Sequence, residues 1–567
     1  MKSLLKKHEL LIFIVAFVLI KQLLVLTLPI NAYSTAGHDD RLMINFSNSI
    51  LHGDWLGSYS EMTLVKGSFF PFFLAVDSII GIPYTMAITL LYSFSCIVFI
   101  IGIKSLFKTK ISLYIMFFIL LFNPVTYADD TFLRVYRNCL TASQILIITG
   151  CMFAIYFNRN KKIRNIIPWS IGSGIGLASL WHTREDGIWI IPFIFIVIII
   201  TLFSIFRNKD TFFEEKIIKG LFVFLPIIFL LTSSWMIAAL NYSHYGIFTT
   251  NELNKSNFTK VIKLMYSVQP SEDIDYVSVP RSTMNKLYVA SPALNSIKND
   301  IESSLDQWSA VGKKGDDLEV EDGWFFWSIR SGVSAAGYYE NAKKANEFYE
   351  KISKEIESGF SSGKLIKRGT MPSALMSPWK ASYADLLPQK IISTYLYVAT
   401  YDGVQTQIIE SIDDKNNGIR IFERITNNLA LYPGEDSYQG DHFRVKILNK
   451  IAAVYQKTGL VFFLVAIFCY LVISFLSLTK NKREKYELED TWLVLTGLLG
   501  SMSVLILGVS YTDISAYSAI LYSYLSGAYP LMISFEIISI SVLIENLIYN
   551  YLSSGGNYSK KKFKSIK

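Results

Sequence analysis

Apolar runs of about 20 residues recur along this chain and constrain its fold more than any other feature. A helix of that length matches the roughly 30 Å hydrocarbon core of a bilayer. Only 18% of the 567 residues are charged, against 51% that are hydrophobic, which is unusual for a soluble domain. Membrane spans are expected near residues 9–30, 83–106, 111–128, 139–157, 166–181, 188–206, 217–240, 458–478, 491–511 and 530–551. The sequence therefore predicts an α-helical polytopic membrane protein with about ten transmembrane helices.

Basic residues gather in the short connections between these runs. They include Lys2, Lys6 and Lys7 before the first span, and clusters within 104–110, 159–164, 207–219, 480–485 and 560–567. When the ten spans alternate in direction, every cluster falls on one side, which the positive-inside rule assigns to the cytoplasm. Both termini are then predicted to be cytoplasmic. The net charge of +8 is explained by this pattern, so nucleic acid is not an expected partner.

The same topology divides the chain into three parts. Residues 1–240 form a membrane domain with seven spans and a first outer loop at 31–65. Residues 241–457 form an extracytoplasmic, mainly helical domain, and residues 458–567 return to the membrane with three spans and a cytoplasmic basic tail. The segment 69–80 is apolar but too short to cross a bilayer, so we expect an interfacial or re-entrant helix there.

Helical spacing of apolar residues predicts a helix over 333–357 within the extracytoplasmic domain, and a further helix is expected over 389–398. An aromatic-rich patch precedes the first of these helices. Its members are Leu305, Trp308, Trp324, Phe325, Trp327 and Ile329. Aromatic rings stack on the apolar faces of sugars, but they also fill ordinary cores, and the core interpretation is favoured for most of the patch.

Acidic and basic side chains occur together in the first three outer loops. The charged or ionisable residues are His38, Asp39, Asp40 and Arg41 in the first loop, Asp129, Asp130, Arg134 and Arg137 in the second, and Arg184, Glu185 and Asp186 in the third. Such residues near the bilayer surface suit a site that holds an anionic lipid headgroup. The alternative for each acidic residue is a helix cap or a solvated turn, and for each arginine a structural ion pair.

Four short motifs carry a resemblance to a known family. They are Gly37-His38-Asp39-Asp40, Gly53-Asp54-Trp55-Leu56-Gly57, Thr63-Leu64-Val65-Lys66-Gly67 and Thr183-Arg184-Glu185-Asp186-Gly187-Ile188-Trp189. With the span pattern and the long outer segment, they resemble the GT-C membrane glycosyltransferases and an uncharacterised bacterial subgroup of membrane proteins. The adjacent Asp-Asp pair departs from the Asp-x-Asp or Asp-Glu of that family.

The resemblance implies a transferase in the cell membrane whose active site is extracytoplasmic. It would move a sugar from a polyprenyl-phosphate donor to an envelope glycan, lipid or protein acceptor. The resemblance also implies that the configuration at the anomeric carbon is inverted in the transfer. Asp39 or Asp40 would be the catalytic base. The donor phosphate and substrate would be bound by Lys66, Arg134, Arg137, Arg184, Glu185 and His38, with the arginines favoured as the phosphate clamp.

Metal use is left open by the sequence. Mg²⁺ or Mn²⁺ prefers oxygen ligands, and the candidates are Asp39, Asp40, Asp129 and Asp130. A metal-free site is preferred slightly, because adjacent carboxylates diverge. Two other classes of protein stay open: a flippase or transporter of polyprenyl-linked glycans, and a membrane-anchored scaffold. The chain has no P-loop, GxSxG or HExxH motif, so a nucleotide-driven transporter or a soluble-type hydrolase has no support.

Overall fold

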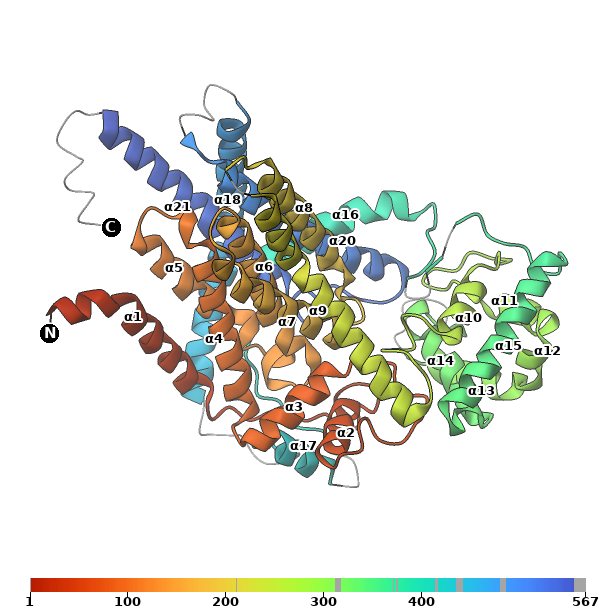
Figure 1. The fold of residues 1–567 in the computed structure, drawn as a ribbon. Coiled ribbons are helices and arrows are strands. Elements are labelled where there is room, and N and C mark those ends of the chain that lie inside the picture. Colours follow the sequence, from red (N-terminus) through yellow and green to blue (C-terminus); the bar gives the residue numbers. More distant parts are fainter. Residues whose placement is uncertain are drawn as a thin grey trace.

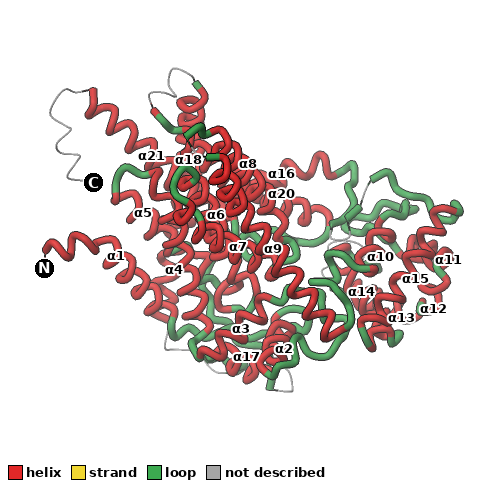
Figure 2. The backbone as a smooth tube through the Cα atoms, in the orientation of Figure 1, coloured by secondary structure: helices red, strands yellow, loops and turns green. Residues whose placement is uncertain are grey.

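The computed structural model describes residues 2–554, except 211, 312–317, 371, 374–375, 414–416, 435–441 and 480–485. Within this part of the chain, helices dominate and β structure is limited to isolated bridges (Figure 2). The basic clusters at 480–485 and 560–567, and the side chains of Lys2, Lys6 and Lys7, lie outside what is described.

A bundle of long apolar helices forms the larger part of the molecule (Figure 1). It consists of α1 (Lys2–Val25), α4 (Tyr84–Ile103), α5 (Lys110–Leu121), α6 (Thr141–Asn158), α7 (Ile167–Thr183), α8 (Ile191–Arg207), α9 (Phe213–Tyr245), α18 (His442–Leu478), α20 (Glu489–Ser515) and α21 (Ala528–Ser554). Their buried side chains make one continuous core, while many large apolar residues of α8, α9 and α18 face outward. An apolar exterior on a well-packed bundle is what lipid requires, so the chain is a polytopic membrane protein.

Seven helices of the described chain are long and apolar enough to cross a membrane. They correspond to the predicted spans at 83–106, 139–157, 188–206, 217–240, 458–478, 491–511 and 530–551. The other three predicted spans coincide with helices as well, namely α1, α5 and α7. Of these, α5 has 12 residues and α7 has 17, which is short for a full crossing.

A separate group of helices lies at one side of the bundle (Figure 1). It contains α10 (Asn257–Tyr266), α11 (Arg281–Ala290), α12 (Pro292–Ser296), α13 (Lys298–Ser309), α14 (Asp322–Ala335) and α15 (Ala342–Ser361). These helices share their own hydrophobic core, which runs from Leu253 to Leu365 and also takes in Val65 of the first loop. We call this unit the outer domain.

The predicted helix over 333–357 is in fact two helices. The first, α14, ends at Ala335, and α15 begins at Ala342. Gly337, with φ of 80°, lies between them, and Asn341 caps α15 by accepting the Lys344 backbone N–H. The prediction was wrong at this point because apolar spacing continued across a break that the glycine allows.

The rest of the long polar stretch packs back onto the bundle. Helix α16 (Tyr383–Ala399), which covers the helix expected at 389–398, packs against α20. Helix α17 (Gly418–Thr426) packs against α2 (Asp40–Leu51) and α3 (Phe69–Ile80). The helix predicted at 69–80 is confirmed as α3, which ends at Gly81 in the left-handed conformation. The first loop therefore contacts α17 through α2, and it contacts the core of the outer domain through Tyr59, Met62 and Val65.

Candidate active site

Asp39 and Asp40 stand at the start of α2, where an aspartate commonly caps a helix. Asp39 occupies the N-cap position, but its side chain accepts no capping hydrogen bond from the helix. Its backbone carbonyl accepts the Met43 N–H, while its carboxylate turns toward Lys66. The capping alternative therefore does not describe what the Asp39 carboxylate does.

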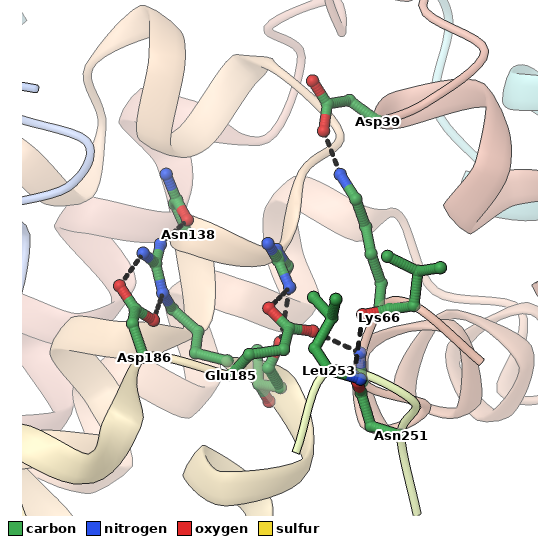
Figure 3. A network of polar contacts seen from close by, with 12 residues as sticks. Asp39, Lys66, Asn138, Glu185, Asp186, Asn251 and Leu253 are labelled. Atoms are coloured by element: carbon green, nitrogen blue, oxygen red, sulfur yellow. Dashed lines mark hydrogen bonds and ion pairs between the residues drawn. The ribbon is translucent and has the colours of Figure 1, made fainter. Parts of the chain in front are cut away.

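The Asp39 carboxylate accepts two hydrogen bonds through one oxygen. Oδ1 accepts from the Lys66 ammonium and from the Tyr136 hydroxyl, the latter at 3.0 Å. Burial would raise the pKa of Asp39, but the Lys66 charge and hydrogen bond, helped by Arg137 and Tyr136, hold this pKa at about 2. No hydrogen bond to Oδ2 is found among the described residues, and Figure 3 shows this oxygen pointing away from Lys66. Asp39 thus has one oxygen held by its partners and one open.

Asp40 differs from its neighbour in both burial and pairing. Its side chain is fully buried and forms a bidentate pair with Arg134, with distances of 2.8 Å from Nε and 2.6 Å from Nη2. Burial raises the pKa of Asp40, and Arg134 opposes that rise. The Asp39 side chain, by contrast, is 43% exposed. Of the two predicted catalytic carboxylates, only Asp39 can be approached by a substrate.

Tyr136 was not singled out from the sequence, yet it connects the basic residues. Its hydroxyl donates to Asp39 and accepts from Lys66 and from Arg137 Nε, both at 3.2 Å. Its ring centroid lies 5.3 Å from Lys66 Nζ, 4.9 Å from the Arg134 guanidinium carbon and 5.5 Å from that of Arg137. A tyrosine face attracts cations, so this ring holds three like charges together. The only sequence signal was an aromatic residue between two arginines.

Glu185 joins the second and third outer loops to the first. It forms an ion pair with Arg137 and accepts the Gly67 backbone N–H at 2.6 Å (Figure 3). On the other side of Lys66, the Asn251 side-chain amide donates to the Val65 carbonyl at 2.7 Å. The backbone on both sides of Lys66 is therefore fixed by segments far away in sequence.

Arg184 lies at the end of α7 in a separate pair. Its Nε donates to Asp186 at 2.7 Å, and its guanidinium also donates to Asn138 and faces the ring of Tyr524. The structural ion pairs that the sequence offered as an alternative are thus present in this structure. Each candidate cation has a carboxylate partner: Lys66 with Asp39, Arg134 with Asp40, Arg137 with Glu185 and Arg184 with Asp186.

The four metal candidates do not come together as a metal site. Asp39 and Asp40 are each paired with a cation, which would repel a metal ion. Asp129 accepts hydrogen bonds from the Tyr522 hydroxyl and from the Asp130 backbone N–H. No group of three or more His, Cys, Asp or Glu residues suited to a metal occurs in the described part of the chain. The residues present do not fit a Mg²⁺ or Mn²⁺ site.

A pocket of about 490 Å³ opens beside Asp39. It is lined by His38, Asp39, Gln307, Trp308, Val311, Trp324, Trp327 and Ser331. The His38 ring stands edge-on to Trp308 and Trp327, with centroids 5.1 and 5.0 Å apart. Burial lowers the pKa of His38, and the Lys66 charge lowers it further, so this imidazole is neutral near pH 7. His38 therefore lies with the residues that line the pocket and not with the cluster of cations.

A second, almost wholly apolar groove of about 370 Å³ runs between α6, α8 and α20. Its lining includes Trp189, Phe193 and Ile200 on the α8 side, and Trp492 and Val504 of α20. Trp189 follows Asp186 by three residues, so one end of the groove lies close along the chain to the Arg184 turn. The groove extends from there into the membrane-spanning bundle.

No model of a protein family matches this sequence, and no curated protein matches it. Among solved structures, the chain is similar to apo ArnT from Cupriavidus metallidurans, with 10% identity and a TM-score of 0.31 over 89% of this chain and 78% of that one. It is also similar to an Archaeoglobus fulgidus oligosaccharyltransferase tethered with an acceptor peptide. That likeness has 12% identity and a TM-score of 0.29, over 86% of this chain and 59% of the other.

A third similar structure is AglB from Archaeoglobus fulgidus in complex with an inhibitory peptide and a dolichol-phosphate. It shares 12% identity at a TM-score of 0.27, over 86% of this chain and 60% of that chain. These three likenesses concern the fold alone. At such TM-scores the backbones correspond only loosely, and no side chain of the site is placed by the likeness.

Proposed function

We propose that the chain is a membrane glycosyltransferase of the GT-C type. It transfers a sugar from a polyprenyl-phosphate donor to an acceptor in the cell envelope, at the extracytoplasmic end of the bundle. The observation that carries the proposal is the half-open Asp39 carboxylate, which has a cluster of cations on one side and a pocket on the other. A base between an anion-binding region and an acceptor pocket is what an inverting transfer requires.

The donor binds with its phosphate among the cations and its polyprenyl chain in the apolar groove between α6, α8 and α20. Because every cation already has a carboxylate partner, the phosphate binds by exchanging partners with one of them. Lys66 is the best placed for this exchange. Its partner Asp39 is 43% exposed, whereas Arg134 and Arg137 are tied to carboxylates that are at most 12% exposed. Arg184 also has an exposed partner, Asp186, but only the partner of Lys66 lines the pocket. Lys66, and not the arginines that the sequence favoured, is the first phosphate contact in this proposal.

The exchange prepares the base. When Lys66 moves to the phosphate, Asp39 loses the charge that keeps its pKa low, and burial then makes it a stronger base. The acceptor hydroxyl oxygen attacks the anomeric carbon, and its proton passes to Asp39 Oδ2. The bond from that carbon to the phosphate oxygen breaks, and its electron pair leaves with the polyprenyl phosphate. Lys66 and Arg137 offset the charge on the leaving phosphate.

Donor consumption is the direct test. The purified protein in lipid is given radiolabelled polyprenyl-phosphate sugars and an envelope extract, and loss of the donor is followed. A transferase consumes the donor, whereas a flippase leaves it chemically intact. Asp39→Asn should lower the rate by roughly 10²- to 10⁴-fold, because an amide cannot accept the proton. Asp39→Asn protein that folds and keeps near-normal transfer would remove Asp39 from the base role.

A further inference from the structure

Three tryptophans of the outer domain form one wall of the pocket beside Asp39. Trp308 comes from α13, and Trp324 and Trp327 come from α14. The Trp308 ring is nearly parallel to that of Trp327, with 9° between the planes and 6.3 Å between centroids. The plane of the Trp308 ring makes an angle of 21° with that of Trp324, and the two ring centroids are 6.2 Å apart. The Trp308 ring is therefore roughly parallel to both of its neighbours, and the wall offers more aromatic surface than a single indole.

This wall lies at the edge of the outer-domain core: Trp327 is a buried member of that core, whereas Trp308 and Trp324 pack against it. Leu305, Phe325 and Ile329 of the same two helices are buried in that core, with at most 2% of their surface exposed. Trp308 and Trp324 are only partly buried and border the pocket. The aromatic patch found in the sequence thus contributes to both the core and the pocket, and Trp327 belongs to both. A partly exposed aromatic surface inside a concave site favours a ligand with an apolar face.

The other lining groups are polar but mostly uncharged. Gln307 offers an amide, Ser331 offers a hydroxyl, and the Trp308 indole N–H donates to that hydroxyl at 3.2 Å. Among the described residues, the lining of the pocket contains no lysine or arginine, and the described cations lie on the other side of Asp39. A pyranose ring combines an apolar C–H face with a rim of hydroxyls, and it matches an aromatic wall bordered by an amide and a hydroxyl. The volume of about 490 Å³ has room for such a ring.

The position of Asp39 indicates whether the pocket holds the donor sugar or the acceptor. Its Oδ1 faces Lys66 and Tyr136, on the side of the cations, and Asp39 itself lines the pocket. A ring lying on the tryptophan wall can bring a hydroxyl to the open Oδ2. We propose that the tryptophan-lined pocket binds a pyranose ring of the acceptor, so that the acceptor is a saccharide. This inference rests on the proposed function, because it takes Asp39 as the group that receives the acceptor proton.

Binding is tested without turnover by saturation-transfer NMR on the full chain in lipid nanodiscs. The probes are methyl pyranosides of glucose, galactose, mannose, rhamnose, N-acetylglucosamine and N-acetylgalactosamine. We expect saturation transfer to ring C–H protons of at least one probe. Trp308→Ala should weaken that binding by about 3- to 10-fold, on the scale of a lost aromatic contact, and Trp308→Phe should restore most of it. Gln307→Ala is a second variant at an exposed position, expected to weaken binding without affecting folding.

Trp379→Ala is the matched control. Trp379 is also partly exposed and stacks on a ring, that of Tyr511, but it does not line the pocket. This variant should bind the probes as the wild type does. No saturation transfer from any probe, or equal transfer in wild type, Trp308→Ala and Gln307→Ala, would overturn the proposal.

Steady-state kinetics then show whether the pocket binds the acceptor or the donor sugar. Trp308→Ala should raise KM for the envelope acceptor and leave KM for the polyprenyl donor unchanged. A rise in the donor KM alone would assign the pocket to the donor sugar and overturn the inference. Asp39→Asn should keep the binding of the probes while losing transfer. If it keeps transfer too, the proposed base fails, whereas the saccharide pocket is judged separately by the Trp308 variants.

Discussion

Two of the ion pairs that hold the first outer loop differ sharply in their surroundings. Arg330 and Glu252 form a pair that is 0% and 6% exposed. Arg330 also donates to the Glu61 carbonyl at 2.7 Å, and Glu252 accepts from the Tyr59 hydroxyl at 2.7 Å. Lys66, which follows Glu61 by a few residues, pairs with Asp39, and the Asp39 carboxylate is 43% exposed. The first pair has no space for another partner, whereas the second borders a pocket.

The difference shows how one loop can be both fixed and reactive. A buried, fully bonded pair cannot exchange partners without leaving a charge unsolvated, so it serves to position the loop. A half-open pair can pass its cation to an incoming anion, because water and substrate can solvate the groups during the exchange. Arg330 thus acts on the site through the backbone that carries Lys66, and it touches no reacting atom.

Breaking the buried pair should have the largest effect. Arg330→Met leaves Glu252 buried without its partner, and we expect a loss of about 3–5 kcal/mol in the free energy of unfolding. Thermal or denaturant unfolding in detergent measures it. Lys260→Met is the control, because Lys260 and Glu357 form an exposed pair worth at most about 1 kcal/mol. Equal losses in both variants would show that burial does not distinguish these pairs.

Gly67 tests how closely the loop must approach the bundle. A Cβ at this position would lie 2.1 Å from the backbone oxygen of His182, at the end of α7. Gly67→Ala must therefore push the two backbones apart, and we expect a loss of about 1–3 kcal/mol in stability. Because Gly67 also donates to Glu185, the change should displace Lys66 and raise KM for the donor.

Gly37 provides a matched comparison next to the acidic pair. A Cβ at Gly37 meets nothing within 4 Å, and its φ is not in the left-handed region. Gly37→Ala should change stability and donor KM little. A Gly67→Ala protein that behaves like Gly37→Ala would contradict the close approach seen between the loop and α7.

These comparisons show which features the sequence could predict. Hydropathy identified the long helices and α3, because membrane spans and interfacial helices depend on local composition. Turn chemistry and charge also brought Asp39, Arg137 and Arg184 to attention. Their pairing was not predictable, because Asp40 and Arg134 are 94 positions apart and meet only through tertiary packing. Nothing local distinguishes Asp39 from Asp40, although one carboxylate is open and the other is buried.

Two further features could not be predicted from the sequence, for the same reason: the role of Tyr136 and the different environments of the aromatic residues in 305–329. Tyr136 binds three cations, but its role depends on loops that converge from distant parts of the chain. The aromatic patch reads as one cluster in sequence, yet helical geometry turns Phe325 into the core and Trp324 toward the pocket. Sequence spacing gives the face of a helix, but the partner of each face comes only from the fold.

The smallest expected effect is a shift in a pH profile, and it tests the exchange itself. In the free protein Lys66 holds the pKa of Asp39 at about 2, so the acidic limb of kcat/KM lies near that pH. With donor bound, Lys66 faces the phosphate, so the acidic limb of kcat should lie roughly 1 to 3 pH units higher. In Lys66→Met the ammonium is absent in both states, so both limbs should lie at the higher pH. Lys260→Met should keep the wild-type separation. Limbs of kcat and kcat/KM that coincide in the wild type would mean that Lys66 stays with Asp39 when the donor binds.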